Sequence, residues 1–274
     1  MLHSIKDLEG TAISASDGDI GNVKDFYFDD EAWAIRYLIV ETGSWLSNRK
    51  VLISPLMINR SGWEGNVLAT SITKERVQNS PNIDTDRPVS RQHESQYFGY
   101  YGYPFYWSGL GMWGDYAYPG MLIGVPRYLR DNAQDQDSHQ TYTRIKTASA
   151  DHHDDHHLRS CNEVMKYTIH ASDGDIGRVD GMLLDEETWA IRYLIVNTSN
   201  WWHGHQVLIA PYWIESVSWG HSSVSVDLTR QAVKDAPHYD PFAPMDREQE
   251  VGLYKHYGRN GYWLNKQDLA QAIA

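Results

Sequence analysis

The sequence contains a single cysteine, Cys161, which excludes a disulfide bond within the chain and gives no sign of an oxidising compartment. Its first residues, MLHSIKDLEG, have neither a basic start nor an apolar run, so we expect no signal peptide. No stretch approaches the roughly 20 apolar residues that cross a bilayer. These absences predict a soluble, cytoplasmic protein with no membrane-spanning segment.

Clusters of lysine and arginine are also missing, and the formal net charge is −12. Such a chain is poorly suited to nucleic acids, which proteins bind largely through phosphate contacts, and to anionic lipid surfaces. The sequence has no Gly-rich phosphate loop, no cysteine–histidine ligand set and no nucleophile elbow. We therefore expect no nucleic-acid partner, no cofactor and no enzymatic activity.

A strict repeat is present: the eight residues WAIRYLIV occur at 33–40 and again at 189–196. Their alternation of Ile, Val, Tyr and Trp predicts a β-strand. Because both faces of this strand are mostly apolar, it should be covered on both sides. Corresponding residues stay 156 positions apart as far as Trp107 and Trp263, so the chain consists of two copies of one unit.

The predicted units are residues 1–107 and 158–274. Between them, residues 108–157 are first rich in Gly, Tyr and Pro and then in Asp, Gln, Ser and His, which is typical of a linker. The first half of this linker contains Trp113 and other large side chains, and it is a candidate for packing on a barrel.

Each unit is predicted to hold several short strands and one short helix. The motif SDGDIG at 16–21 predicts a hairpin turn; a calcium loop is the alternative, but its further oxygen ligands do not follow. Residues 73–79, with Thr73 as the N-cap, predict the helix, and 229–236 are its copy. The strands suggest a small, closed or partly open barrel, and the fold class is all-β.

Acidic residues precede the repeated strand in both copies. Paired carboxylates can act as acid and base, which would make the protein an enzyme with shifted pKa values in a pocket at a pseudo-two-fold axis. Acids at an exposed hairpin tip more often serve solvation, and this interpretation is favoured. The residues are Asp29, Asp30 and Glu31, with Asp185, Glu186 and Glu187.

The string DHHDDHH at 151–157 carries side chains that bind zinc, nickel or copper. It lies in the predicted linker and has no equivalent in the other copy, and a flexible string lacks the outer partners that orient metal ligands. We therefore expect no metal site, and the weak candidates are His152, His153, His156 and His157.

Arg36 and its copy Arg192 lie in the middle of an apolar strand, where an unpaired charge would be costly. The favoured interpretation is an ion pair with an acid on a neighbouring strand or in the tail. The alternative is an anchor for an anion or a partner.

An aromatic tail follows each predicted barrel, at 97–107 in the first copy. A base-stacking platform is one interpretation, but such platforms lie in basic grooves. Rings that cover barrel surface or bind a partner protein are therefore favoured. The interaction candidates of the two copies are Arg36, Trp45, Tyr101, Trp107, Arg192, Trp201, Tyr257 and Trp263.

In the motifs at 16–21, 33–46 and 51–55, and in their second copies, the units resemble the PRC-barrel family. The resemblance covers about 3–80 and 159–236. This family includes the cytoplasmic domain of the photosynthetic reaction-centre H subunit and the C-terminal domain of a ribosome-maturation factor. The resemblance implies an all-β barrel used for assembly or interaction, with no catalytic residues to carry over. The tail looks like that of free-standing bacterial members.

The sequence thus predicts two tandem PRC-type barrels, associated within the chain as a pseudo-two-fold pair. The expected function is a non-enzymatic protein-interaction or complex-assembly module. The alternative is a protein that binds a small ligand or a metal in the cleft between the two barrels.

Overall fold

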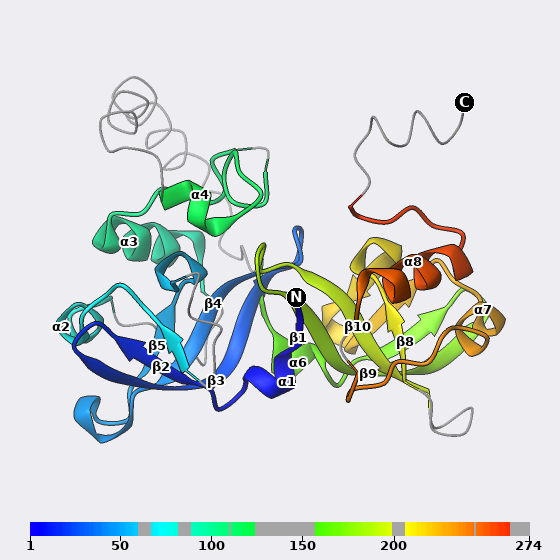
Figure 1. Ribbon diagram of the computed structural model, residues 1–274, viewed down its shortest axis with the longest axis horizontal. Helices are drawn as coiled ribbons and strands as arrows, with labels where there is room; N and C mark the ends of the chain where they lie inside the picture. Colours follow the sequence, from blue (N-terminus) through cyan, green and yellow to red (C-terminus); the bar gives the residue numbers. More distant parts are fainter. Residues whose placement is uncertain are drawn as a thin grey trace. The chain divides into compact units, whose positions relative to one another are not determined.

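The computed structural model describes residues 1–59, 67–81, 89–109, 111–123, 157–198, 206–243 and 245–263. The chain forms two compact units (Figure 1). Both have β-sheets at their centre, so the predicted mainly-β class is confirmed. The N-terminal unit consists of Asp7–Asn162 with Glu186–Ala190, and the C-terminal unit consists of Met1–Lys6, Glu163–Asp185 and Ile191–Ala274.

The N-terminal unit contains a six-stranded sheet. Its strands are β2 (Ala12–Ala15), β3 (Gly18–Asp29), β4 (Ala34–Glu41), β5 (Lys50–Ile53), β6 (Val67–Ala69) and β7 (Leu158–Ser160). Their order is β5-β4-β3-β2-β6, with β7 also paired to β3. All of the repeated octapeptide except Trp33 lies in β4, which pairs on both sides and is buried along all but its last residue, Glu41, as its two apolar faces predicted.

The C-terminal unit contains a seven-stranded sheet of the same design. Its strands are β1 (Leu2–Ser4), β8 (Thr168–Ala171), β9 (Gly174–Asp185), β10 (Ile191–Asn197), β11 (Gln206–Ile209), β12 (Ile214–Ser218) and β13 (Ser223–Val226). The order is β11-β10-β9-β8-β13-β12, with β1 also paired to β9. In both units one pair is parallel, β2 with β6 and β8 with β13, and the other pairs are antiparallel.

Short helices connect or cover these strands. The α-helices are α1 (Ile5–Leu8), α2 (Lys74–Gln78), α3 (Arg91–Tyr101), α4 (Pro119–Ile123), α6 (Cys161–Val164), α7 (Arg230–Lys234) and α8 (Arg247–His256). The 3-10 turns are η1 (Gly43–Leu46), η2 (Pro55–Met57), η4 (Pro211–Trp213) and η5 (Trp219–His221).

The predicted hairpin turn joins β2 to β3. Asp17 in this turn accepts a hydrogen bond from the backbone N–H of Lys74, the first residue of α2, at 2.8 Å. Thr73 caps the same helix by accepting a hydrogen bond from the N–H of Arg76, as predicted. The Asp17 carboxylate therefore helps to start a helix.

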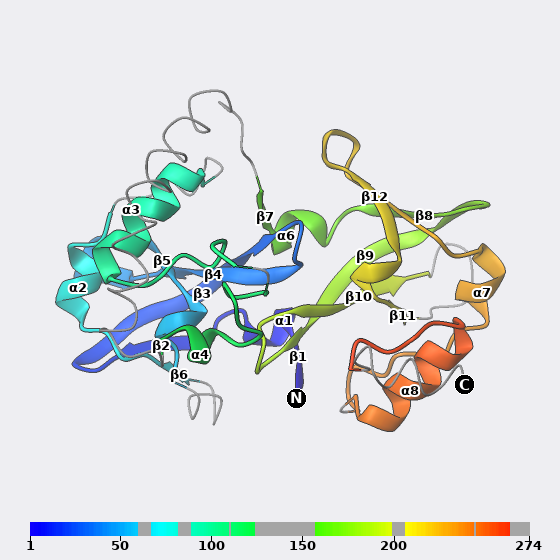
Figure 2. The ribbon, with the colours of Figure 1, turned by 90° about the horizontal axis from the view of Figure 1, so that it is seen from above.

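The two repeats exchange their first strands. β1 pairs with β9 of the C-terminal unit, where Leu2 lies opposite Asp185. β7 pairs with β3 of the N-terminal unit, where Leu158 lies opposite Asp29. Leu2 and Leu158 are equivalent positions of the repeat, and so are Asp29 and Asp185, so the register is the same in both units. Both short strands are labelled in Figure 2, and in each case the strand completes the sheet of the other repeat.

The aromatic tails begin with two helices, α3 and α8, which the sequence analysis did not predict. Ser90 caps α3, which ends at Gly102 with a positive φ of 72°. Tyr97 and Phe98 of α3 pack edge-on against Tyr37 of β4. The tail therefore covers the sheet of its own unit through a helical face, and α3 and α8 can be followed in Figures 1 and 2.

The described part of the predicted linker comprises 108–109, 111–123 and His157. Trp113 is fully buried in the N-terminal unit, and its indole N–H donates to the carbonyl of Thr188 at 2.8 Å. Further along, α4 packs against η2. The first half of the linker thus packs on the N-terminal unit, as its composition suggested.

Candidate functional site

Arg36 lies inside the N-terminal unit, with 3% of its side chain exposed. Its Nη2 atom lies 3.3 Å from Oδ2 of Asp29 at the end of β3, and its Nη1 atom donates to the carbonyl of Met112 at 2.7 Å. The centre of the Tyr106 ring lies 3.9 Å from the guanidinium carbon. A buried charge requires such partners. Arg36 therefore has the ion pair with a neighbouring strand that its position favoured.

Asp29 is held in its ionised form by its surroundings. Burial alone would raise the pKa of this carboxyl, but Arg36 and the backbone N–H groups of Ala32 and Glu31 outweigh burial and lower it. These two N–H groups donate to Oδ1 at 3.1 and 3.0 Å. The same carboxylate thus neutralises Arg36 and fixes the turn that leads into β4.

Glu94 on α3 is a second buried carboxylate in this region. The hydroxyls of Tyr37 and Tyr106 donate to its Oε1 at 2.9 and 2.7 Å. Arg91 and His157 lie 3.2 and 2.6 Å from its Oε2. Burial, and then Glu94 itself, raise the pKa of both tyrosines well above the ordinary value, so they remain donors. The helix, the strand and the end of the linker meet at this one side chain.

The C-terminal unit repeats the arrangement. Arg192 lies 2.7 Å from Asp185, and the hydroxyls of Tyr193 and Tyr262 donate to Glu250 at 2.8 and 2.9 Å. Each of these residues is the repeat equivalent, 156 positions further on, of a residue in the N-terminal arrangement. We call these two sets the buried clusters: Asp29, Arg36, Tyr37, Arg91, Glu94 and Tyr106 in the N-terminal unit, and Asp185, Arg192, Tyr193, Arg247, Glu250 and Tyr262 in the C-terminal unit.

The two buried clusters differ at their edge. His157 and Trp113 complete the N-terminal cluster, where Trp113 lies 4.8 Å from the guanidinium of Arg36. The residue equivalent to His157 is Met1, which is 73% exposed. From the sequence, His157 was expected only as a weak metal-ligand candidate. The signal for its burial is its position directly before the second predicted unit, where β7 begins.

Two of the predicted interaction residues lie beside the clusters. The guanidinium carbon of Arg91 lies 4.6 Å from the ring centre of Trp107, and that of Arg247 lies 4.4 Å from the ring centre of Trp263. Both indoles are half-buried. They cover the clusters and leave part of each ring accessible.

Three further predicted interaction residues, Trp45, Tyr101 and Tyr257, lie within the described residues. The indole N–H of Trp45 donates to the carbonyl of Ile20 at 2.6 Å. Tyr101 is buried, with burial raising its pKa to about 12. Tyr257 packs against Trp213, with 4.7 Å between ring centres. The last predicted interaction residue, Trp201, lies outside the described residues, and so do three of the weak metal candidates, His152, His153 and His156.

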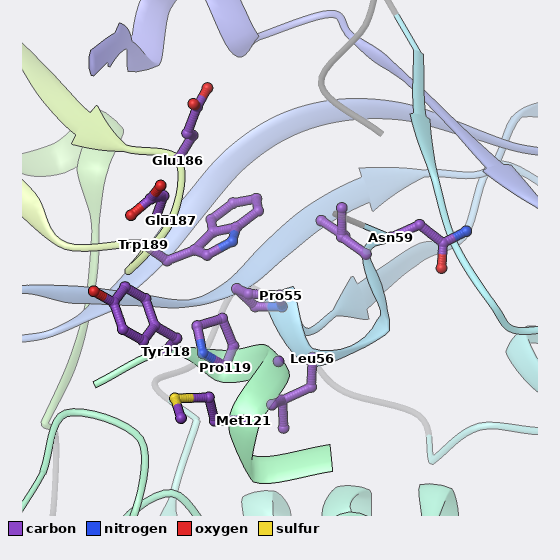
Figure 3. A pocket seen from close by; sticks show the side chains of 11 residues that line it. Pro55, Leu56, Asn59, Tyr118, Pro119, Met121, Glu186, Glu187 and Trp189 are labelled. Atoms are coloured by element: carbon purple, nitrogen blue, oxygen red, sulfur yellow. The ribbon is translucent and has the colours of Figure 1, made fainter. Parts of the chain in front are cut away.

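An open pocket of about 530 Å³ lies in the N-terminal unit, and none of the described residues that line it is among the six of the buried cluster. Three segments line it: η2 with the two residues that follow, the start of α4, and the turn 186–189 (Figure 3). Trp189 in this turn has a φ of 59°, a left-handed conformation that is uncommon for a large residue. No single motif of the sequence indicated this pocket, because its walls are far apart along the chain.

Within the described ranges, no group of three or more His, Cys, Asp or Glu side chains could hold a metal ion. The helices of the same ranges include none with both the length and the apolar character needed to cross a membrane.

Comparison with known proteins identifies the first repeat. Residues 2–75 match the PRC-barrel domain. The chain is also 34% identical over 99 residues to an uncharacterized protein of Deinococcus radiodurans, an alignment that covers 32% of this chain and 35% of that protein. The chain thus spans about a third of the length of this relative. The second repeat shares its strand order with the first. The first repeat is therefore similar in sequence to the PRC-barrel domain over residues 2–75.

Proposed function

We propose that the protein is a non-enzymatic, cytoplasmic interaction module whose C-terminal unit binds a partner protein. The observation that carries this proposal is a contrast between Leu56 and Tyr212, which are equivalent positions of the two repeats. Leu56 on η2 is 2% exposed, and α4 packs against η2. Tyr212 on η4 is 74% exposed. The same position of the turn is buried in one unit and exposed in the other, although Pro211 and Trp213 on either side of Tyr212 are buried.

The kind of partner follows from what covers η2. The helix α4 has the sequence PGMLI, a short apolar segment that begins with proline. We expect the partner to present a similar segment to η4. A tyrosine suits this contact because its ring buries a large area with few rotatable bonds, while its hydroxyl can still form a hydrogen bond.

The buried clusters support a structural rather than a catalytic use of the repeated acids. Asp29 and Asp185 are ion-paired with the arginines of their own units, and Asp30 lies 2.9 Å from Nε of Arg159. Burial raises the pKa of Asp30, although Arg159 opposes this effect. These carboxylates stabilise turns and strands, which makes an enzyme using them the weakest of the proposals.

The test is quantitative affinity purification of the tagged protein from its native cells, with soluble and detergent-solubilised fractions run side by side. We expect a stoichiometric protein partner, whose affinity for the Tyr212→Ser variant falls about thirtyfold, the effect of losing a hot-spot side chain. Phe242→Ser is the matched control, since Phe242 is 96% exposed on the same unit. Recovery of the bare protein from both fractions, or equal binding by both variants, would contradict the proposal.

Binding of a small ligand or a metal remains a separate prediction. A thermal-shift screen of the full chain with metals and metabolites tests it. Stabilisation that is unchanged in the Tyr212→Ser variant would assign a ligand function independent of the partner surface.

A further inference from the structure

The sheet of the C-terminal unit has one face made of polar side chains. In β8 and β13, Ile169 and Val224 are fully buried, while the residue on either side of each points to the opposite face and is half-buried. The strand pairings align these outward residues with those of β9 and β12 in two rows. One row is Ser218, Ser223, Thr168 and Arg178, and the other is Ser216, Ser225, His170 and Asp175. We call these residues the polar face; β8, β9 and β12 are labelled in Figure 2.

Several groups of the polar face have no partner of their own. In the described part of the chain, neither the hydroxyls of Thr168, Ser223 and Ser225 nor the guanidinium of Arg178 forms a hydrogen bond or an ion pair. Each hydroxyl can donate one hydrogen bond and accept two, and a guanidinium donates in a fork that matches a carboxylate. These groups can therefore bind a polar ligand without breaking contacts within the protein.

The first repeat shows that the sheet does not require these groups. The three hydroxyl residues and the arginine correspond to Ala12, Val67, Ala69 and Asn22. The strands β2 and β6 of the first repeat nevertheless pair in the same register as β8 and β13. The hydroxyls and the guanidinium are thus specific to the second repeat, and pairing of the strands does not explain them.

The spacing of the polar face indicates the kind of ligand. Neighbouring strands lie about 4.8 Å apart, so each row presents polar groups at regular intervals over about 14 Å. A flat molecule with several hydroxyl groups, such as a sugar ring, matches this pattern. Arg178 at the end of one row adds a preference for a negative group, and the nearby Asp175 favours a singly charged carboxylate over a doubly charged phosphate.

We propose that the polar face binds an acidic saccharide, a sugar that carries a carboxylate. The carboxylate pairs with Arg178, and the ring hydroxyls form hydrogen bonds with Thr168, Ser223 and Ser225. This site goes beyond the proposed partner surface, because that surface is assigned to η4, and no residue of η4 belongs to the polar face.

The test uses three probes that separate the charge from the hydroxyl groups: glucuronate, glucose and acetate. Saturation-transfer NMR on the full chain measures the affinity of each probe. We expect saturable binding of glucuronate. Glucose and acetate should each bind about tenfold more weakly, because glucose lacks the charge-assisted contact and acetate lacks the hydroxyl contacts.

Two variants carry residues that the first repeat has at the same positions. Thr168→Ala/Ser225→Ala should weaken the binding of both glucuronate and glucose about tenfold. Arg178→Asn should remove the preference for glucuronate over glucose. The control Ser44→Ala/Ser71→Ala removes two exposed hydroxyls of the N-terminal unit and should bind glucuronate as the wild type does.

Acetate binding as tightly as glucuronate would mean a simple anion contact and would overturn the proposal. So would the absence of saturable glucuronate binding, or an equal loss of affinity in the control. Arg178 is exposed, so Arg178→Asn tests the site even if the double variant folds poorly; an unchanged preference for glucuronate in this variant would also overturn the proposal.

Discussion

The Nε2 atom of His157 lies 2.6 Å from Oε2 of Glu94, and both side chains are buried. In the C-terminal unit the equivalent carboxylate, Glu250, has the corresponding tyrosine and arginine partners, but Met1 stands at the position of His157. The arginines differ as well: 27% of the Arg91 side chain is exposed, against 54% for Arg247. Glu94 and Glu250 are therefore a matched pair whose surroundings differ in burial and in one partner.

Neutralising these two carboxylates should have unequal effects. Glu94→Gln replaces the negative charge beside Arg91 and His157 with a neutral amide, and breaking a buried charge pair typically costs about 3–5 kcal/mol of the free energy of unfolding. Glu250→Gln should cost clearly less, because Arg247 can turn to water. Urea denaturation of both variants, followed by tryptophan fluorescence, measures the difference. Equal losses would mean that neither His157 nor the deeper burial of Arg91 adds to the stability of the N-terminal cluster.

The lowered pKa of Asp29 predicts how stability depends on pH. A carboxyl whose pKa is lower in the folded than in the unfolded protein stabilises the fold above its unfolded pKa, about 3.9, and this contribution disappears as the pH falls through the folded pKa. Wild type should therefore exceed Asp29→Asn in unfolding free energy at pH 7, and the gap should shrink below about pH 4. Urea titrations between pH 2 and 7 measure the gap, with the exposed Glu248→Gln as a control. A difference in unfolding free energy between wild type and Asp29→Asn that does not change with pH would refute an ionised Asp29.

Gly21, the last residue of the SDGDIG motif, is required by a close backbone contact. A Cβ atom at this position would lie 1.9 Å from the carbonyl oxygen of Glu41 on the neighbouring strand. Gly21→Ala should therefore force β3 and β4 apart and destabilise the protein by several kcal/mol, of the order seen for severe steric changes in a core. Gly220→Ala is the control, since no atom lies within 4 Å of its added Cβ. Similar melting temperatures for the two variants would show that the contact relaxes easily.

The local elements could be predicted because side-chain patterns encode them. Alternating apolar residues gave β4, and the Asp-Gly pair gave the hairpin before β3. Arg36 was expected to pair with an acid, and the hairpin between β3 and β4 supplies Asp29 as that acid. The start of β4 was less predictable: Trp33 opens the repeated motif but has a φ of 50°, and the strand begins at Ala34.

Two features could not be predicted from the sequence in this way. The helix α3 buries Glu94, Tyr97 and Tyr101 on one face, a helical spacing that was hidden because its aromatic residues are confined to 97, 98, 100 and 101 at its end and the first six positions are polar. The exchange of β1 and β7 depends on backbone hydrogen bonds, which leave no side-chain pattern. Each of these strands has only three residues, so nothing local distinguishes pairing with one sheet from pairing with the other.

The strand exchange predicts which unit responds to a substitution in β1 and which responds to one in β7. Proline cannot donate a ladder hydrogen bond and disrupts a strand. His3→Pro should therefore speed amide hydrogen exchange at residues 183–185 of β9, and Arg159→Pro should speed it at residues 27–29 of β3. Mass-spectrometric hydrogen exchange on the two full-length variants separates these regions. The reverse pattern would mean that β1 and β7 each pair with the sheet of their own repeat.

The exchange also gives a reason for the expected behaviour of an isolated first repeat. A fragment of residues 1–107 keeps β1 and β3 but lacks both β7 and β9. In this fragment β1 has lost the strand it pairs with, β9, and β3 has lost β7. Since β1 and β7 are equivalent and pair in the same register, β1 of one fragment can pair with β3 of a second fragment. We expect a dimer by analytical ultracentrifugation, and a fragment of residues 7–107 that fails to dimerise. A stable, well-folded monomer of residues 1–107 would show that the pairing of β1 is dispensable and that a repeat folds without strand exchange.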